Sequence, residues 1–330
     1  MPLPLIIPIA VGIAGLFGAG KAAQAAFRTS EANDIQGNAD GIVSAAEKSL
    51  ESGKETCNTT LRAYGETKID VLNTAITDFI SLYGQLKNVQ LGHSHELDRL
   101  EIGDFSEVTL EDLRLSCSFA AELTGGTLAG AGAGAITAFG AYSGTMALAS
   151  AGTGTAISGL SGVAATNATL AWLGGGTLAA GGYGVAGGAV VLGTLVAGPA
   201  LLVLGSVLSA RASKRLDDAR ANLEKAQTYD TEVGVVLEKL KAIVEVTLVG
   251  QDLIQAIKTR LDDANTSLKH VIGTYGVDYS LYDEPSKDAV FRSVKTAQLM
   301  KKVIDTPILN EDGSLAEHTL IGFQGIKESI

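Results

Sequence analysis

A glycine-rich stretch near the start of the chain has the spacing of a phosphate-binding loop. Gly15-Leu16-Phe17-Gly18-Ala19-Gly20-Lys21 matches that motif up to its lysine. The next residue is Ala22, whereas the motif needs Ser or Thr there to hold magnesium. Pro4 and Pro8 also interrupt the strand that should precede such a loop. Because small residues in an apolar helix often reproduce this spacing, we reject nucleotide binding.

A second group of polar residues could hold a metal ion. His93 and His95 lie close to Glu96 and Asp98. On a helix the two histidines would diverge, and the spacing supplies no definite third ligand. We therefore favour a solvated loop and predict no metal site.

The remaining reactive side chains lack the partners that catalysis needs. No Gly-x-Ser-x-Gly elbow occurs between a strand and a helix, and neither Cys57 nor Cys117 has an adjacent His. We expect two free thiols, while a bridge between them stays open. Asp217-Asp218 and Asp262-Asp263 fall in helical patterns, where a solvated face explains them. We predict no enzymatic activity and no cofactor.

Composition narrows the possible partners. The chain has 330 residues, a formal net charge of −11 and a sequence pI near 4.9, yet its mean hydropathy is +0.25. This combination requires that charged and apolar residues be segregated along the chain. The acidity and the lack of a basic patch argue against nucleic-acid binding. They also indicate that any membrane binding would be hydrophobic rather than electrostatic.

The segregated apolar part is the segment Leu123–Ala210, which we call the uncharged segment. Its 88 residues contain no Asp, Glu, Lys, Arg or His, and they include more than half of the 40 glycines in the chain. A soluble domain rarely continues so far without charge, because its surface needs charged side chains. An apolar helix of about 20 residues crosses a bilayer, so this segment could make two to four passes.

Three apolar runs divide the uncharged segment: Leu123–Leu148, Thr153–Leu173 and Thr177–Ala210. Glycines at every fourth position in the first run line one face of a helix and allow close packing of a second helix. The only Trp ends the second run, as expected at a bilayer interface, and a Pro in the third run would kink a membrane helix. The residues expected to serve membrane insertion or helix packing are Gly126, Gly130, Gly134, Gly140, Gly144, Trp172, Gly184, Gly188 and Pro199.

Several states of the uncharged segment are compatible with its composition. Glycine opposes an isolated helix in water by about 1 kcal/mol per residue relative to Ala, whereas a bilayer makes helix nearly compulsory. We favour a segment that packs on its own protein in solution and rearranges in lipid. A permanent membrane anchor, a buried glycine-rich core and a β-hairpin around Gly152–Thr155 remain alternatives.

Two amphipathic stretches flank the uncharged segment. Apolar residues recur at threes, fours and sevens from Thr29 to Leu91, with weak points at Gly53, Gly65 and Gly84. A stronger heptad-like pattern runs from Arg211 to Ile272. We predict an all-α fold: a coiled-coil-like stalk of two long helices, with the uncharged segment as a glycine-zipper hairpin. Antiparallel pairing would place that segment at one end, or the segment could fold back along the stalk.

The ends of the chain complete the predicted division. Pro2–Gly20 resembles a signal sequence, but without a basic start we prefer a membrane-inserting helix to a signal or a buried helix. Thr109 and Ser286 are expected helix caps, and Pro307 should end the C-terminal helix before short extended pieces at 308–309 and 314–315. The parts are an apolar helix (1–28), amphipathic helices (29–122), the uncharged segment (123–210), a long helix (211–272) and a C-terminal helix with an extended tail (273–330), forming one structural unit.

Two resemblances extend this interpretation. Met1-Pro-Leu-Pro-Leu-Ile-Ile and the stretch from Ser161 to Gly176, SGVAATNATLAWLGGG, resemble a set of uncharacterised bacterial proteins over most of the chain. The layout, long helices around a hydrophobic segment, resembles the helical pore-forming toxins of the cytolysin A and haemolysin BL group. That resemblance implies a segment hidden in a soluble form and inserted on assembly. It is one of layout and assigns no individual residue.

The sequence therefore predicts a membrane-inserting, pore-forming or membrane-permeabilising helical protein. Its expected partners are a lipid bilayer and further copies of the same chain, with a protein partner of unknown identity. We expect it at a membrane, with a soluble form that is cytoplasmic or secreted. The alternative is a non-lytic, membrane-associated coiled-coil scaffold in a bacterial system.

Overall fold

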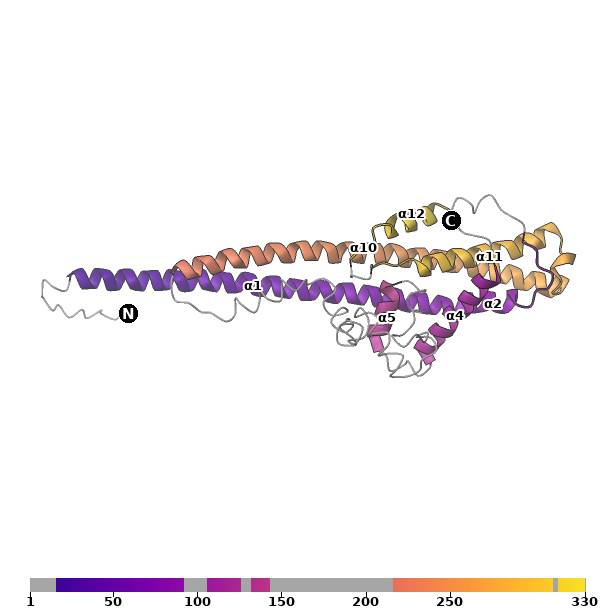
Figure 1. The fold of residues 1–330 in the computed structure, drawn as a ribbon, viewed down its shortest axis with the longest axis horizontal. Helices are drawn as coiled ribbons and strands as arrows, with labels where there is room; N and C mark the ends of the chain where they lie inside the picture. The colour runs from indigo at the N-terminus through magenta and orange to yellow at the C-terminus, as the bar shows by residue number, and fades with distance from the viewer. Residues whose placement is uncertain (1–15, 92–105, 126–131, 143–215, 311–313, 330) are drawn as a thin grey trace, which may run out of the picture. The chain divides into compact units, whose positions relative to one another are not determined.

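The computed structural model describes residues 16–91, 106–125, 132–142, 216–310 and 314–329. These residues are mostly helical and include no β-strand, which confirms the predicted helical class (Figure 1). Two compact units are formed, the smaller from 1–51 with 197–237 and the larger from 52–196 with 238–330. The elements are α1 (Leu16–Val71), the π-helix η1 (Leu72–Ile76), α2 (Thr77–Tyr83), α4 (Glu107–Gly125), α5 (Gly132–Ala141), α10 (Leu216–Tyr275), the 3₁₀-helix η5 (Tyr279–Leu281), α11 (Glu284–Asp305) and α12 (Thr319–Ser329).

In the smaller unit, the first part of α1 packs against the first part of α10. Small apolar side chains are buried at seven-residue intervals, which keeps one face of each helix turned inward. At the edge, Arg220 forms an ion pair with Glu31 at 3.4 Å, and Asn222 Nδ2 donates to Gln36 Oε1 at 2.9 Å. The buried apolar residues are Ala32, Ala39, Ala46, Leu50, Ala219, Ala226, Tyr229, Val233 and Val236.

Contacts in the larger unit show the relative direction of the chain segments that contain α1 and α10. Asn265 Nδ2 of α10 donates to the Ala75 carbonyl of η1 at 2.8 Å. Further on, Lys87 N donates to the Val277 carbonyl at 2.8 Å, and Tyr279 N donates to the Lys87 carbonyl at 3.0 Å. Residue numbers therefore rise together on the two partners, as they also do in the smaller unit.

The antiparallel arrangement, which was one of the alternatives, is therefore not the one observed: within each unit α1 and α10 are parallel. A heptad pattern determines which face of a helix is buried, but it carries no information on the direction of the partner. A short loop cannot join two parallel helices, because the chain has to return to the start of the second one. The 132 residues between Tyr83 and Leu216, α4 and α5 among them, connect the two helices in the chain.

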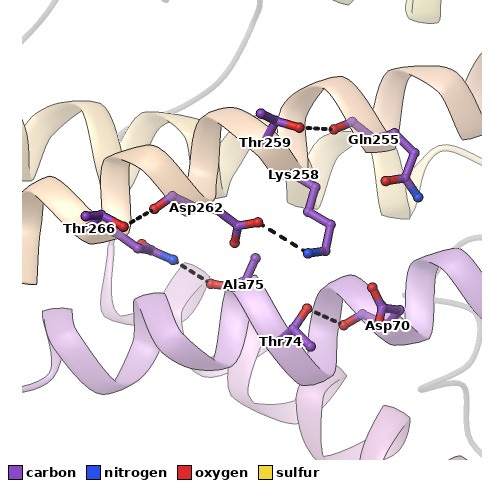
Figure 2. Close-up of polar contacts among 9 residues, drawn as sticks. Asp70, Thr74, Ala75, Gln255, Lys258, Thr259, Asp262 and Thr266 are labelled. Carbon is purple, nitrogen blue, oxygen red and sulfur yellow. Dashed lines mark hydrogen bonds and ion pairs between the residues drawn. The ribbon is translucent and has the colours of Figure 1, made fainter.

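The long helix predicted from Thr29 to Leu91 is interrupted and ends early. It changes to a π-helix at Leu72 and stops at Tyr83, with Gly84 as its C-cap. The wider π turn leaves carbonyls available to side chains. The Leu72 carbonyl accepts from Thr77 Oγ1 at 2.7 Å and from Cys117 Sγ at 3.2 Å. Figure 2 shows the region where η1 meets α10 and the bond that ends on the Ala75 carbonyl.

The N-caps of α11 and α4 differ from those predicted. The cap of α11 is Asp283, whose carboxylate accepts from Ser286 N at 3.0 Å, so Ser286 receives the cap rather than forming it. For α4 the hydroxyl of Ser106 accepts from Thr109 N at 3.3 Å, so the expected cap at Thr109 is likewise wrong. In both cases the capping side chain lies three residues before the residue chosen.

The C-terminal part of the chain agrees in part with the elements predicted for it. Helix α11 ends at Asp305, two residues before Pro307, and an isolated antiparallel bridge joins Leu309 to Leu315. Helix α12 follows, where only an extended tail was expected. Both cysteines are free thiols, so the alternative of a Cys57–Cys117 bridge is wrong.

Candidate functional site: the end of α5 and the buried Lys68

The uncharged segment meets the helical body where α5 crosses α1 in the larger unit. A Cβ atom added to Gly65 would lie 2.1 Å from the Ile136 carbonyl oxygen. One added to Gly140 would lie 1.9 Å from the Leu61 carbonyl oxygen. No side chain fits at these distances, so the two backbones touch only because both positions are glycine.

One turn beyond this crossing, the Lys68 side chain of α1 is completely buried. Its Nζ atom lies 3.4 Å from the Phe139 carbonyl oxygen and 3.5 Å from those of Gly140 and Tyr142. The last carbonyls of a helix have no partner within it and carry its negative dipole end. Lys68 therefore donates to the C-terminal end of α5.

Aromatic rings complete the surroundings of the amine. Nζ lies 4.5 Å from the centroid of the Tyr64 ring and 5.7 Å from that of Phe139. Within the described residues the buried Tyr64 hydroxyl has no hydrogen-bond partner. It lies close to Gly250 of α10, where an added Cβ would be 2.9 Å from it. The Lys68 amine is thus enclosed by carbonyl oxygens and ring faces, away from water.

This environment changes the acid–base properties of the site. Burial lowers the pKa of Lys68 to about 7, and the negative charge of Asp305 opposes that change. Burial also raises the pKa of the Tyr64 hydroxyl. Asp305, on α11, forms an ion pair with Lys301. Lys68 can therefore gain or lose its proton near neutral pH while it stays enclosed.

A second set of bonds holds the same end of α5. The Ala141 carbonyl accepts from the backbone N–H of Ile308 at 2.9 Å and of Leu309 at 3.0 Å. These residues form the segment between α11 and α12. The C-terminal end of α5 is thus attached to α1 through Lys68 and to the C-terminal part of the chain through Ala141.

A lysine with a pKa near 7 could in principle act as a nucleophile or proton carrier. Lys68 is fully buried, however, and its amine points at main-chain oxygens and aromatic rings. Its contacts connect two helices, which favours a structural and electrostatic role.

The predicted packing glycines fall unevenly on the described residues. Gly140 lies at the crossing, and Gly134 lies within α5. Gly126, Gly130, Gly144, Trp172, Gly184, Gly188 and Pro199 lie outside the described residues, as do His93 and His95.

The two residues of α1 that receive α5 are not predicted by the sequence pattern. That pattern indicates only a weak point of the helix at Gly65 and assigns no role to Lys68. A signal was present: Lys68 falls on the buried stripe formed by Leu61, Tyr64 and Leu72. A charged residue on an apolar helical stripe indicates a buried partner for that charge.

Two other motifs are placed by the structure. Residues 16–21 of the phosphate-loop-like motif belong to α1 and form helix rather than a loop. Asp262 pairs with Lys258 at 3.2 Å, and Figure 2 shows the pair between α10 and η1, with the Asp262 side chain 49% exposed and that of Lys258 23% exposed. Among the described helices, none is both long and apolar enough to cross a membrane.

Comparison with protein-family models, with curated proteins and with solved structures finds no match for this chain.

Proposed function

We propose that this chain is a membrane-inserting helical protein, pore-forming or membrane-permeabilising, which keeps its uncharged segment on its own helices in a soluble form. The observation that carries the proposal is the docking of α5. This helix belongs to the uncharged segment, and it packs on α1 through the Gly65–Gly140 crossing. A segment of bilayer-like composition thus contains, near its start, a helix that packs on the amphipathic helix α1.

The contacts of α5 suit a reversible attachment. Phe139 packs against Phe119 of α4 with ring centroids 5.5 Å apart, and the glycine crossing adds close backbone contact. No residue of α5 is ionisable, so its transfer into lipid carries no cost for burying a charge. The amine of Lys68 stays on α1 when α5 leaves.

Dye release from liposomes tests this function. Purified full chain is added to phosphatidylcholine vesicles, with and without phosphatidylglycerol, that contain a self-quenched dye. We expect release from the neutral vesicles at least equal to that from the anionic ones, because a net charge of −11 is repelled by anionic lipid. The matched control lacks Thr124–Ser209 and should release no dye. Full chain that neither binds nor permeabilises either vesicle would reject the proposal.

The same assay separates the second candidate, a non-lytic membrane-associated scaffold that recruits a protein partner. The larger unit exposes the apolar side chains of Leu281 and Ile321, 74% and 66% accessible, which a partner could cover. Co-flotation of the protein with vesicles that retain their dye would support the scaffold.

For the membrane-inserting function, we further propose that the active form is a homo-oligomer. Chemical cross-linking on vesicles should then give multimers that the deletion control does not form.

A further inference from the structure

We propose that Lys68 acts as a proton-controlled clamp on the uncharged segment: its neutral amine permits the end of α5 to stay docked on α1, and protonation loosens that end. The inference deepens the proposed function by naming a contact that restrains α5, and its biological meaning rests on that function. The clamp consists of Lys68, the last carbonyls of α5 and the Gly65–Gly140 crossing.

The surroundings of the Lys68 amine explain why its protonation affects the docking of α5. The amine has no water contact, and its three acceptors are neutral carbonyl oxygens at 3.4 to 3.5 Å, long for hydrogen bonds. A neutral amine donates its two N–H groups to two of these oxygens at little cost. An ammonium group in the same position is favoured by the dipole end of α5 and by the two ring faces, but it loses its hydration, and for a completely buried charge that loss is the larger effect.

The titratable groups near the Lys68 amine lie on α1, directly after α5, and on α11. Tyr64 faces the amine from α1 itself, and Tyr142 follows α5 and supplies a carbonyl. Asp305 acts on Lys68 from α11 and is shared with Lys301. Asp305 is thus the one described carboxylate whose charge favours the ammonium form, and Lys301 neutralises part of that charge.

The direction of the pH effect follows from the two states of the amine. In the docked state the pKa of Lys68 is about 7, whereas a solvated lysine has its ordinary value of 10.5. Between these values the undocked state binds a proton that the docked state lacks, so lowering the pH favours undocking. The ratio of undocked to docked α5 should rise by up to about tenfold per pH unit down to pH 7, then level off.

Hydrogen–deuterium exchange of the lipid-free full chain measures this ratio. The peptide covering 132–142 is followed from pH 9 to pH 6, with rates corrected for the intrinsic pH dependence of exchange. We expect its protection to fall by more than tenfold between pH 9 and 7 and by less than about threefold below pH 7. A peptide from 253–268 of α10, in the same unit, serves as the internal reference.

Two variants assign the effect to the clamp. Lys68→Met keeps the length of the side chain without a titrating amine, and protection of α5 in this variant should not vary with pH. Asp305→Asn removes the charge that favours the ammonium form, so the levelling-off should move to lower pH. Asp288→Asn, an exposed change on the same helix, should not change the pH at which protection levels off.

Equal pH dependence in the original chain and in Lys68→Met would overturn the inference, as would protection that falls when the pH is raised. If Lys68→Met does not fold, an unchanged profile in Asp305→Asn overturns it instead. Because no lipid is present, these results are independent of dye release. A pH-dependent clamp in a chain that never permeabilises vesicles would reject only the membrane function.

Discussion

Gly65 of α1 and Gly140 of α5 lie at the same helix crossing, and a methyl group on either would overlap a carbonyl oxygen of the other helix. An added Cβ atom would lie 2.1 Å from that oxygen at Gly65 and 1.9 Å from it at Gly140. This contact joins α5, which belongs to the uncharged segment, to α1. Its backbone character makes it sensitive to a single carbon atom.

Replacing Gly65 with Ala should therefore lower the free energy of unfolding by about 1–3 kcal/mol, since the helices must separate to admit the methyl group. Gly273→Ala is the matched control in the same unit, because nothing lies within 4 Å of its added Cβ. That control should stabilise the protein by about 0.5–1 kcal/mol through helix propensity. Urea denaturation followed by circular dichroism measures both. Equal effects of the two changes would show that the crossing is not closely packed in solution.

Stability should rise with pH from 7 to 9. Burial lowers the pKa of Lys68 to about 7 in the folded chain, so in this range the unfolded chain binds a proton that the folded chain has released. The free energy of unfolding then increases by up to about 1.4 kcal/mol per pH unit, and this contribution is constant below pH 7. Urea denaturation at pH 6, 7, 8 and 9 gives the slope, and Lys68→Met should flatten it.

Above pH 9, ionisation of the buried Cys57 thiol adds an opposing contribution to the pH dependence of stability. Burial raises the pKa of the Cys57 thiol to about 11, so above pH 9 the unfolded thiol ionises before the folded one and stability falls. A Cys57→Ala background removes this opposing contribution. A slope that is equally steep in Lys68→Met would assign the pH dependence to other groups.

The buried amide of Asn265 should be coupled to Ser293. Asn265 donates to the Ala75 carbonyl at 2.8 Å and accepts from Ser293 Oγ at 3.0 Å, so it links η1, α10 and α11. Asn265→Ala leaves both partners buried without a bond and should cost about 1–3 kcal/mol. A double-mutant cycle with Ser293→Ala, measured by urea denaturation, should give a coupling energy of at least about 0.5 kcal/mol. Strict additivity would mean that the bond contributes nothing to stability. Thr266→Ala, on the exposed side of the same helix, is the control.

Several features of the fold could be predicted because they depend on local patterns. Heptad spacing at Ala219, Ala226 and Val233 identifies both a long helix and its buried face. Pro307 marks the end of α11 because proline cannot continue a helix. Capping was harder to assign, since Asp283 and Ser286 both favour caps and only the backbone geometry shows which of them accepts the bond.

By itself, the sequence determined that this protein is helical, that its charges are segregated, and that an uncharged glycine-rich segment lies between two amphipathic helices. Only the tertiary structure decided that α1 and α10 run parallel within each unit, that Gly65 meets Gly140, and that Lys68 is buried against the end of α5. The physical reason is that periodicity and propensity act between residues close in the chain. Helix direction, backbone contact and the solvation of an amine depend instead on residues about 70 to 190 positions away, which folding alone brings together.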